Sequence, residues 1–200
     1  MKHLAILLFW GGVLAGGISC TNKVQDNKIN NGAFFSLTDV LSGQSKYLEK
    51  LNLTVNRQSE INGKREEVFF KPDSSFWNKE FKIFEAADID KPSLWDRYRI
   101  NKSDSAGLQI VNYSAINPRL GGTVFLSAVR DTEGNLLDLA IRVKDKNLIY
   151  RSERLLNMKF QPYPSAGKYL LMEYTVTGYQ KIILRKKIEY AIHVTLDRVN

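Results

Sequence analysis

The chain has 200 residues, one cysteine, a formal net charge of +8 and 44% hydrophobic residues. This length and apolar content predict one domain with its own core, and the single cysteine excludes a disulfide framework. The positive charge favours contact with anionic surfaces, but nucleic acid is not an expected partner because no recognition motif accompanies the charge.

The first 19 residues have the order of a secretory signal peptide. Lys2 and His3 precede an apolar stretch over residues 4–14, and small residues follow. The stretch is shorter than the about 20 apolar residues that a membrane-spanning helix needs. Ile18-Ser19-Cys20 resembles a bacterial lipobox, in which the cysteine becomes the mature N-terminus and carries a diacylglycerol. We therefore expect lipidation at Cys20; the alternative is a thiol that lies near a cleavage site by chance.

The segment after the cysteine is polar and rich in Asn and Lys. We expect residues 20–33 to be a flexible tether, followed by a single α+β domain over residues 34–200. Within that domain, apolar residues on one helical face predict a first helix over residues 37–51. Ser36 and Asp39 provide a start similar to a capping box.

A β-hairpin is the next predicted element. Residues 51–61 and 64–71 flank Asn62-Gly63, a dipeptide that favours the type I′ turn of two-residue hairpins.

A second helix is predicted after Pro72 and should end before Pro92. Trp77, Phe81 and Phe84 recur at helical spacing, so we expect this aromatic stripe to face the core rather than a ligand.

From about residue 97 to the end, apolar and polar residues alternate, which predicts six or seven strands with one solvent-exposed face. Loops are predicted at residues 131–135, 144–147 and 162–167. The fold class is therefore α+β: a mostly antiparallel curved sheet or half-barrel of about 8 strands, with two covering helices.

Few residues suit catalysis or metal binding. After the leader the only histidine is His193, on the polar side of the last predicted strand, so neither a zinc site nor a serine-histidine triad is expected. Ser165 and Lys168 match S-x-x-K, but Pro164 and Gly167 indicate a loop rather than the helix that this motif needs. No glycine-rich phosphate-binding motif occurs. We assign no catalytic residue, cofactor or metal.

Two carboxylate pairs are candidates for glycoside hydrolysis, which needs two carboxylates about 5 to 10 Å apart. They are Glu66-Glu67 and Asp88-Asp90. Neighbours on a strand point to opposite faces, and acidic residues at a helix end usually only solvate it. The pairs therefore leave hydrolysis as the alternative function rather than the first.

Basic residues cluster at Arg185-Lys186-Lys187 and at Arg151 and Arg154. Such a cluster either makes a charged turn that protects a sheet edge or contacts an anionic surface. Separately, Asp104-Ser105-Ala106 matches the short D-[ST]-apolar acceptor for O-glycosylation in Bacteroidota envelope proteins, which makes Ser105 a weak candidate for modification.

The lipobox, Phe34-Phe35-Ser36-Leu37, Ile61-Asn62-Gly63-Lys64 and the stretch from Trp77 to Pro92 together resemble a group of uncharacterised Bacteroidota envelope lipoproteins. The resemblance covers most of the chain after Cys20 and implies an outer-membrane lipoprotein with no assigned catalytic residue. Surface-exposed lipoproteins of that phylum tend to carry acidic residues after the cysteine. Residues 21–24 carry none, so we expect the protein to face the periplasm.

These observations predict a noncatalytic, membrane-anchored binding module of the cell envelope. Its ligand would be a lipid, a glycan or a protein held in the concavity of the sheet, and its membrane contact would be the N-terminal lipid. The alternative is a hydrolase of envelope glycan that uses paired carboxylates.

Overall fold

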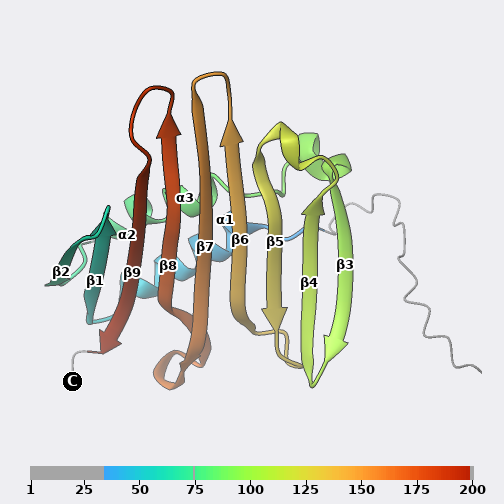
Figure 1. The fold of residues 1–200 in the computed structure, drawn as a ribbon. Helices are drawn as coiled ribbons and strands as arrows, with labels where there is room; N and C mark the ends of the chain where they lie inside the picture. The colour runs from blue at the N-terminus through green and yellow to red at the C-terminus, as the bar shows by residue number, and fades with distance from the viewer. Residues whose placement is uncertain (1–33, 74, 199–200) are drawn as a thin grey trace, which may run out of the picture.

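The computed structural model describes residues 34–73 and 75–198, and Cys20 lies outside them. Within these ranges the fold is α+β: nine antiparallel strands form one open sheet, and short helices cover one of its faces (Figure 1). The predicted fold class is confirmed. The sheet has nine strands rather than about eight.

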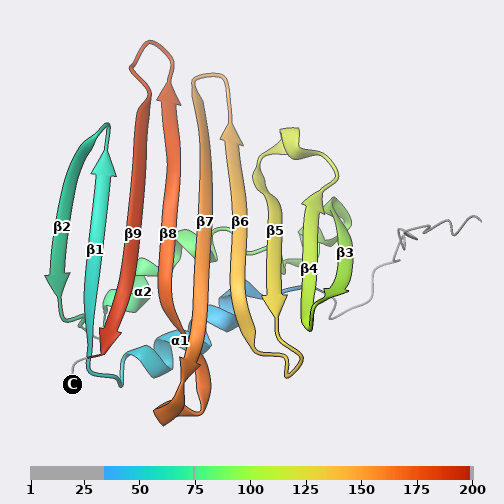
Figure 2. The same cartoon turned by 60° about the horizontal axis from the view of Figure 1, so that its bottom comes forward.

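The strands, in chain order, are β1 (Leu53–Ile61), β2 (Lys64–Phe70), β3 (Tyr98–Ser105), β4 (Leu108–Ala115), β5 (Gly122–Arg130), β6 (Leu136–Lys146), β7 (Tyr150–Tyr163), β8 (Lys168–Ile182) and β9 (Ile188–Arg198). Across the sheet they are ordered β2-β1-β9-β8-β7-β6-β5-β4-β3. Strands β3 to β9 form a meander, and the β1–β2 hairpin pairs with its last strand. The two edges, β2 and β3, lie far apart, so the sheet does not close (Figure 2).

Three α-helices occur in the described part of the chain: α1 (Leu37–Leu48), α2 (Phe76–Glu80) and α3 (Lys82–Glu85). Short 3₁₀ turns span Pro92–Arg97, Pro118–Leu120 and Pro164–Ala166. The first helix starts at the predicted residue but ends three residues before the predicted end. The predicted second helix is wrong as a single element, because it divides at Phe81 into α2 and α3.

All three helices pack on the same side of the sheet, which we call the helix-covered face (Figure 1). Trp77, Phe81 and Phe84 are at most 1% exposed there, which confirms the prediction that the aromatic stripe lies in the core. Every strand from β4 to β9, together with β1, contributes buried apolar side chains to this core. Within the described residues, this core extends from Phe35 to Leu196.

The first hairpin turns at Asn62-Gly63 as predicted. Both residues have positive φ, 49° and 82°, which the type I′ turn requires. The turn also binds the last strand: Asn62 N–H donates to Glu189 O at 2.9 Å, and Glu189 N–H donates to Asn62 Oδ1 at 2.9 Å. These bonds attach the start of the domain to its end.

Two predicted loops are shorter than expected. Strand β6 continues to Lys146, so the turn to β7 contains only Asn147, Leu148 and Ile149. Polar sequence at 144–147 suggested a loop, but cross-strand ion pairs keep it in the sheet. Lys144 lies 3.6 Å from Glu153, and Arg154 lies 3.1 Å from Asp145. The second such loop, at 162–167, begins after Tyr163, where β7 ends.

Opposite the helices lies the uncovered face of the sheet. Because side chains alternate along a strand, each strand sends every second residue to this face. On β1 these residues are Asn56, Gln58 and Glu60, and their partners on β9 are Thr195, His193 and Ala191. Most of this face is polar, as the alternating sequence predicts.

Candidate functional site

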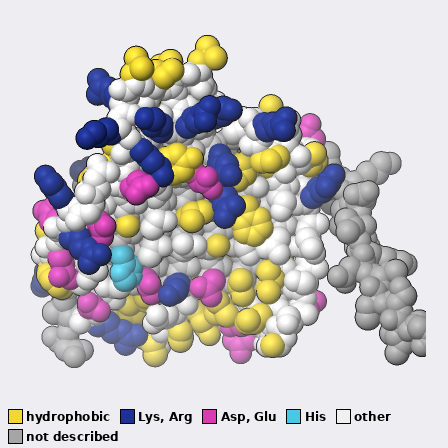
Figure 3. All heavy atoms as spheres, in the orientation of Figure 1, with side chains coloured by type: hydrophobic (Ala, Val, Ile, Leu, Met, Phe, Trp, Pro, Cys, Tyr) yellow, Lys and Arg dark blue, Asp and Glu magenta, His cyan; other side chains and the backbone are white. Residues whose placement is uncertain are grey.

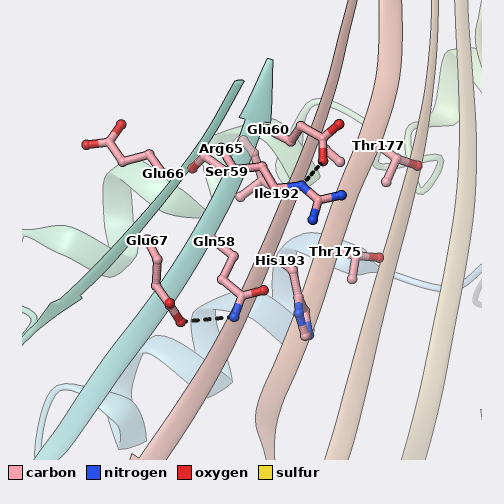
Figure 4. A pocket seen from close by; sticks show the side chains of 11 residues that line it. Gln58, Ser59, Glu60, Arg65, Glu66, Glu67, Thr175, Thr177, Ile192 and His193 are labelled. Atoms are coloured by element: carbon pink, nitrogen blue, oxygen red, sulfur yellow. Dashed lines mark hydrogen bonds and ion pairs between the residues drawn. The ribbon is translucent and has the colours of Figure 1, made fainter. Parts of the chain in front are cut away.

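A pocket of ≈ 630 Å³ lies on the uncovered face, where β2, β1, β9 and β8 run side by side (Figure 4). Its lining residues come from these four strands only: Gln58, Ser59, Glu60, Arg65, Glu66, Glu67, Thr175, Thr177, Ala191, Ile192 and His193. The side chains that point into it are mostly hydrogen-bonding groups.

The register of the sheet brings these side chains together. Gln58 is directly opposite Glu67 on β2 and His193 on β9. His193 is in turn opposite Thr175 on β8, so four side chains form one row across four strands. Cross-strand neighbours on one face have Cβ atoms about 5 Å apart, which makes the row a continuous polar surface.

Within the pocket, two of the acidic groups, Glu60 and Glu67, are bound to neighbouring side chains. Gln58 Nε2 donates to Glu67 Oε1 at 3.0 Å, and Arg65 Nε lies 2.7 Å from Glu60 Oε2. Among the described residues that line the pocket, Arg65 is the one Lys or Arg, against the carboxylates of Glu60, Glu66 and Glu67. The lining therefore offers amide, hydroxyl, imidazole and carboxylate groups with an excess of negative charge.

His193 lines the pocket, and its side chain is 43% exposed. Its Nε2 is 3.1 Å from Glu173 Oε1, and Lys159 Nζ lies 3.4 Å from both oxygens of the same carboxylate. The sequence placed His193 on the polar side of the last strand, and the structure confirms that position. Its contact with Glu173 was not predicted, because it joins two strands.

The two predicted carboxylate pairs do not form hydrolytic sites. Glu66 and Glu67 point to opposite sides of β2, and Glu66 extends away from the pocket in Figure 4. Asp88 accepts hydrogen bonds from Leu37 N–H, Thr38 N–H and Thr38 Oγ1, and Asp90 accepts one from Trp95 Nε1. Both acids of the second pair are thus occupied in holding the helical layer.

Asp88 differs from the expectation for an acid at a helix end, since it is only 6% exposed. Burial acts to raise the pKa of this carboxyl. The hydrogen bonds from Thr38, Asp90 and Leu37 outweigh burial, so its pKa lies below the ordinary value. The carboxylate is therefore a structural cap for α1, because it receives N–H groups at the helix start.

Other predicted positions are found where the pattern placed them. Ser105 ends β3 at an exposed turn, whose next two residues, Ala106 and Gly107, have positive φ. The S-x-x-K match falls on a 3₁₀ turn and the start of β8, not on an α-helix. Among the described residues there is no cluster of three His, Cys, Asp or Glu groups that could hold a metal ion.

A second pocket, of ≈ 440 Å³, opens between the segment after α3 and the β4–β5 connection. Leu94, Ile116 and Leu120 give it apolar walls, while Lys91, Asp96 and Arg97 place charges of both signs around it. Neither Ile116 nor Leu120 is buried, at 53% and 66% exposure. This pocket is smaller than the first, and its lining mixes apolar walls with charges of both signs.

Sequence reasoning missed the first pocket, although its signal is present. Gln58, Thr175 and Thr177 are ordinary polar residues of alternating strands, and only strand order and register join them.

No helix in the described part of the chain is long and apolar enough to cross a membrane. Searches of protein-family models, of curated proteins and of solved structures find no match to this chain. The resemblance to Bacteroidota lipoproteins stays a prediction.

Proposed function

We propose that the protein is a membrane-anchored, noncatalytic binding module of the bacterial cell envelope, and that its pocket on the uncovered face holds a hydroxylated ligand of the envelope glycan class. The observation that carries the proposal is the row of hydrogen-bonding side chains across β2, β1, β9 and β8. The helix-covered face is filled by the core, so the uncovered face is the better surface for a ligand.

The chemistry of the lining favours a glycan over a lipid chain. A lipid chain needs an apolar groove, whereas the side chains from β8 in this pocket are Thr175 and Thr177. Sugar hydroxyls both donate and accept hydrogen bonds, as do amide and hydroxyl side chains. Phe69 lies on the same face of β2, two residues from Glu67, and is 64% exposed. Its ring offers an apolar surface beside the polar row.

Anchoring and location follow from the leader. A diacylglycerol on Cys20 together with an N-acyl chain would hold the protein stably at a membrane. The acid-free sequence over residues 21–24 supports the periplasmic side of the outer membrane. The domain would then meet envelope glycans within reach of its tether.

Hydrolysis of envelope glycan is the alternative. It requires two carboxylates that converge on one bond, and neither predicted pair converges. Glu60 and Glu67 share the uncovered face, but each is bound to a neighbour, Arg65 and Gln58 respectively. We therefore place binding before catalysis.

The test uses His193 as a reporter. The chain has two histidines and the other, His3, is in the leader, so a protein beginning at Thr21 gives one imidazole signal by NMR. Soluble disaccharide-peptide fragments from muramidase-digested peptidoglycan are titrated into this protein. We expect a saturable shift of the His193 signal. Thr175→Val combined with Gln58→Ala should weaken the affinity about tenfold, because two hydrogen bonds are lost.

Ser114→Ala is the matched control, since Ser114 is exposed on the uncovered face of β4, away from the pocket. It should leave the titration unchanged. A His193 signal that no glycan fragment moves, or that only extracted lipid moves, contradicts the proposal. Shortened fragments or new reducing ends in the same sample would instead establish the hydrolase.

A further inference from the structure

Two long hairpins extend beyond the helical layer at one end of the sheet, at the top of Figure 1. We call residues 146–151, the turn from β6 to β7 with the adjoining strand ends, and residues 181–188, the turn from β8 to β9 with its strand ends, the hairpin tips. Leu148 and Leu184 are at their ends and are 96% and 98% exposed. An isolated exposed leucine is ordinary, but here one leucine ends each of two neighbouring hairpins.

Turn chemistry does not explain these leucines. Tight turns favour Gly, Asn, Asp and Ser, because these residues tolerate positive φ or bond to their own backbone. Leu184 nevertheless has a φ of +62°, a conformation that bulky side chains rarely adopt. This strained conformation does not bury the Leu184 side chain, which stays exposed. The leucine is thus unfavourable for the isolated fold, which points to a role outside it.

The tips belong to a larger apolar region. Of the twelve large hydrophobic side chains that are exposed among the described residues, most lie at this end of the sheet. Those at this end are Ile61, Ile116, Leu120, Leu148, Ile149, Ile182, Ile183, Leu184 and Ile188. Exposed apolar residues gathered at one end indicate a contact surface, whereas scattered ones do not.

Cations surround the two leucines. The tips contain Lys146, Arg151, Lys181, Arg185, Lys186 and Lys187 and no acidic residue, in a chain whose net charge is +8. Lys146, Arg151 and Lys181 are consecutive cross-strand partners on the uncovered face. None of these three forms an ion pair with a described carboxylate. Figure 3 shows the apolar ends at the top with basic side chains below them.

This arrangement corrects one prediction. Arg185-Lys186-Lys187 does form a turn, but the turn joins β8 and β9, which are both inside the sheet. The cluster therefore protects no sheet edge. The other alternative, contact with an anionic surface, remains.

The two tips are held together. Ile183 N–H donates to Ile149 O at 2.8 Å, a bond from one turn to the other. Between them is a groove of ≈ 190 Å³ whose walls include Arg151, Lys181 and both isoleucines. Two cations beside an apolar cleft match a phospholipid, in which a phosphate lies next to hydrocarbon.

We propose that the hairpin tips dock on an anionic phospholipid bilayer. Leu148, Leu184 and the neighbouring isoleucines enter the boundary between headgroups and acyl chains, and the surrounding Lys and Arg side chains contact lipid phosphates. Lys187 is paired with Glu189 at 2.6 Å, which leaves five cations of the tips for an outside partner. Charge complementarity selects a bilayer over a protein partner, because cations in a segment without acids match a surface of one sign. A tether over residues 21–33 spans at most about 45 Å, which permits anchor and tips to reach the same membrane. This contact does not depend on the pocket.

Vesicle flotation tests the proposal. Protein beginning at Thr21, which lacks both leader and lipid, is floated with vesicles of phosphatidylethanolamine containing about 30 mol% phosphatidylglycerol and with neutral phosphatidylcholine vesicles. We expect binding to the anionic vesicles, reduced by added salt. Leu148→Asp with Leu184→Asp should weaken it at least tenfold. Arg185→Gln with Lys186→Gln should weaken it about 25-fold, at about fivefold for each cation.

The controls match exposure and charge. Phe69→Asp changes an exposed apolar residue on β2, and Lys71→Gln with Lys102→Gln removes two exposed cations elsewhere. Each should retain full binding. Circular dichroism should show every variant folded, because no changed side chain is buried. Absence of flotation, or flotation unaffected by the double leucine change, overturns the proposal. So does light scattering that shows the tips joining two copies of the chain.

Discussion

The carboxylate of Asp88 accepts the backbone N–H of Leu37 at 3.1 Å, although 51 residues separate them. The same carboxylate accepts Thr38 N–H at 3.1 Å and the Thr38 hydroxyl at 2.6 Å. Free N–H groups at a helix start need partners, and a negative charge there also suits the helix dipole. One side chain thus holds α1 to the segment that follows α3.

Asp88→Asn should destabilise the domain by about 2 kcal/mol, because a buried charged acceptor of several hydrogen bonds is lost. The pKa of Asp88 is lowered in the folded state, so its contribution is complete above the unfolded value of about 3.9 and is lost as pH falls through the folded value. The stability of wild type against urea should therefore fall more steeply below about pH 4 than that of the variant. Asp39→Asn, at an exposed position in the first turn of α1, is the control.

Gly178→Ala should destabilise the protein by about 3 kcal/mol through backbone overlap. A Cβ at Gly178 would lie 2.3 Å from Glu153 O and 2.9 Å from the Tyr190 hydroxyl. Gly43→Ala is the opposite case, since its Cβ meets nothing within 4 Å and the residue lies inside α1. It should stabilise by about 0.5 to 1 kcal/mol. The thermal unfolding midpoints of the two variants should shift in opposite directions from that of wild type. Shifts of the same sign would contradict the contacts expected for the added Cβ atoms.

Glu80→Gln should destabilise by about 2 kcal/mol. Glu80, the last residue of α2, lies 2.5 Å from Arg57 and accepts a hydrogen bond from the Tyr174 hydroxyl. Loss of its charge leaves the partly buried guanidinium of Arg57 without an ion-pair partner. Burial, with the nearby Glu80 charge, raises the pKa of Tyr174, which keeps its hydroxyl protonated as a donor. Glu60→Gln breaks the exposed Glu60–Arg65 pair and should change stability by less than about 0.5 kcal/mol. Chemical denaturation measures the unfolding free energy of both variants. Similar decreases for Glu80→Gln and Glu60→Gln would contradict the difference expected between a partly buried and an exposed ion pair.

Cys20→Ala should move the full-length protein from the detergent phase to the aqueous phase in a Triton X-114 partition, when it is expressed in its own host. The reason is that no other cysteine exists to carry a lipid. Ser19→Ala leaves a small residue before the cysteine and should stay in the detergent phase. A Cys20 variant that remains in the detergent phase contradicts lipidation.

Local features were predictable where neighbouring residues decide them. Asn62-Gly63 specifies its own turn through positive φ, and the aromatic spacing from Trp77 to Phe84 specifies which side of the segment is buried. The split of that segment at Phe81 was not predictable from spacing, since the same three rings lie on one side in either arrangement. Tertiary packing decides the break.

Features that join distant segments escaped prediction. Asp88 resembles a solvated acid in sequence, and only the position of α1 makes it a buried cap. Lys144 and Asp145 resemble loop residues until strand β7 brings Glu153 and Arg154 within ion-pair distance of them. The pocket is a similar case, because Gln58 and Thr175 become neighbours of His193 only through the register of β1 and β8 with β9. Alternation predicts faces, but it does not predict which strands are adjacent.

The pairing of β1 with β9 has a consequence for the order of folding. Asn62 and Glu189, which bond to each other, are 127 residues apart, so the first hairpin has no strand to join until the end of the chain has been made. Contacts of such long sequence separation form slowly. The β1–β2 hairpin therefore cannot take its place in the sheet before β9 is available. The sheet is completed only when the two ends of the domain meet.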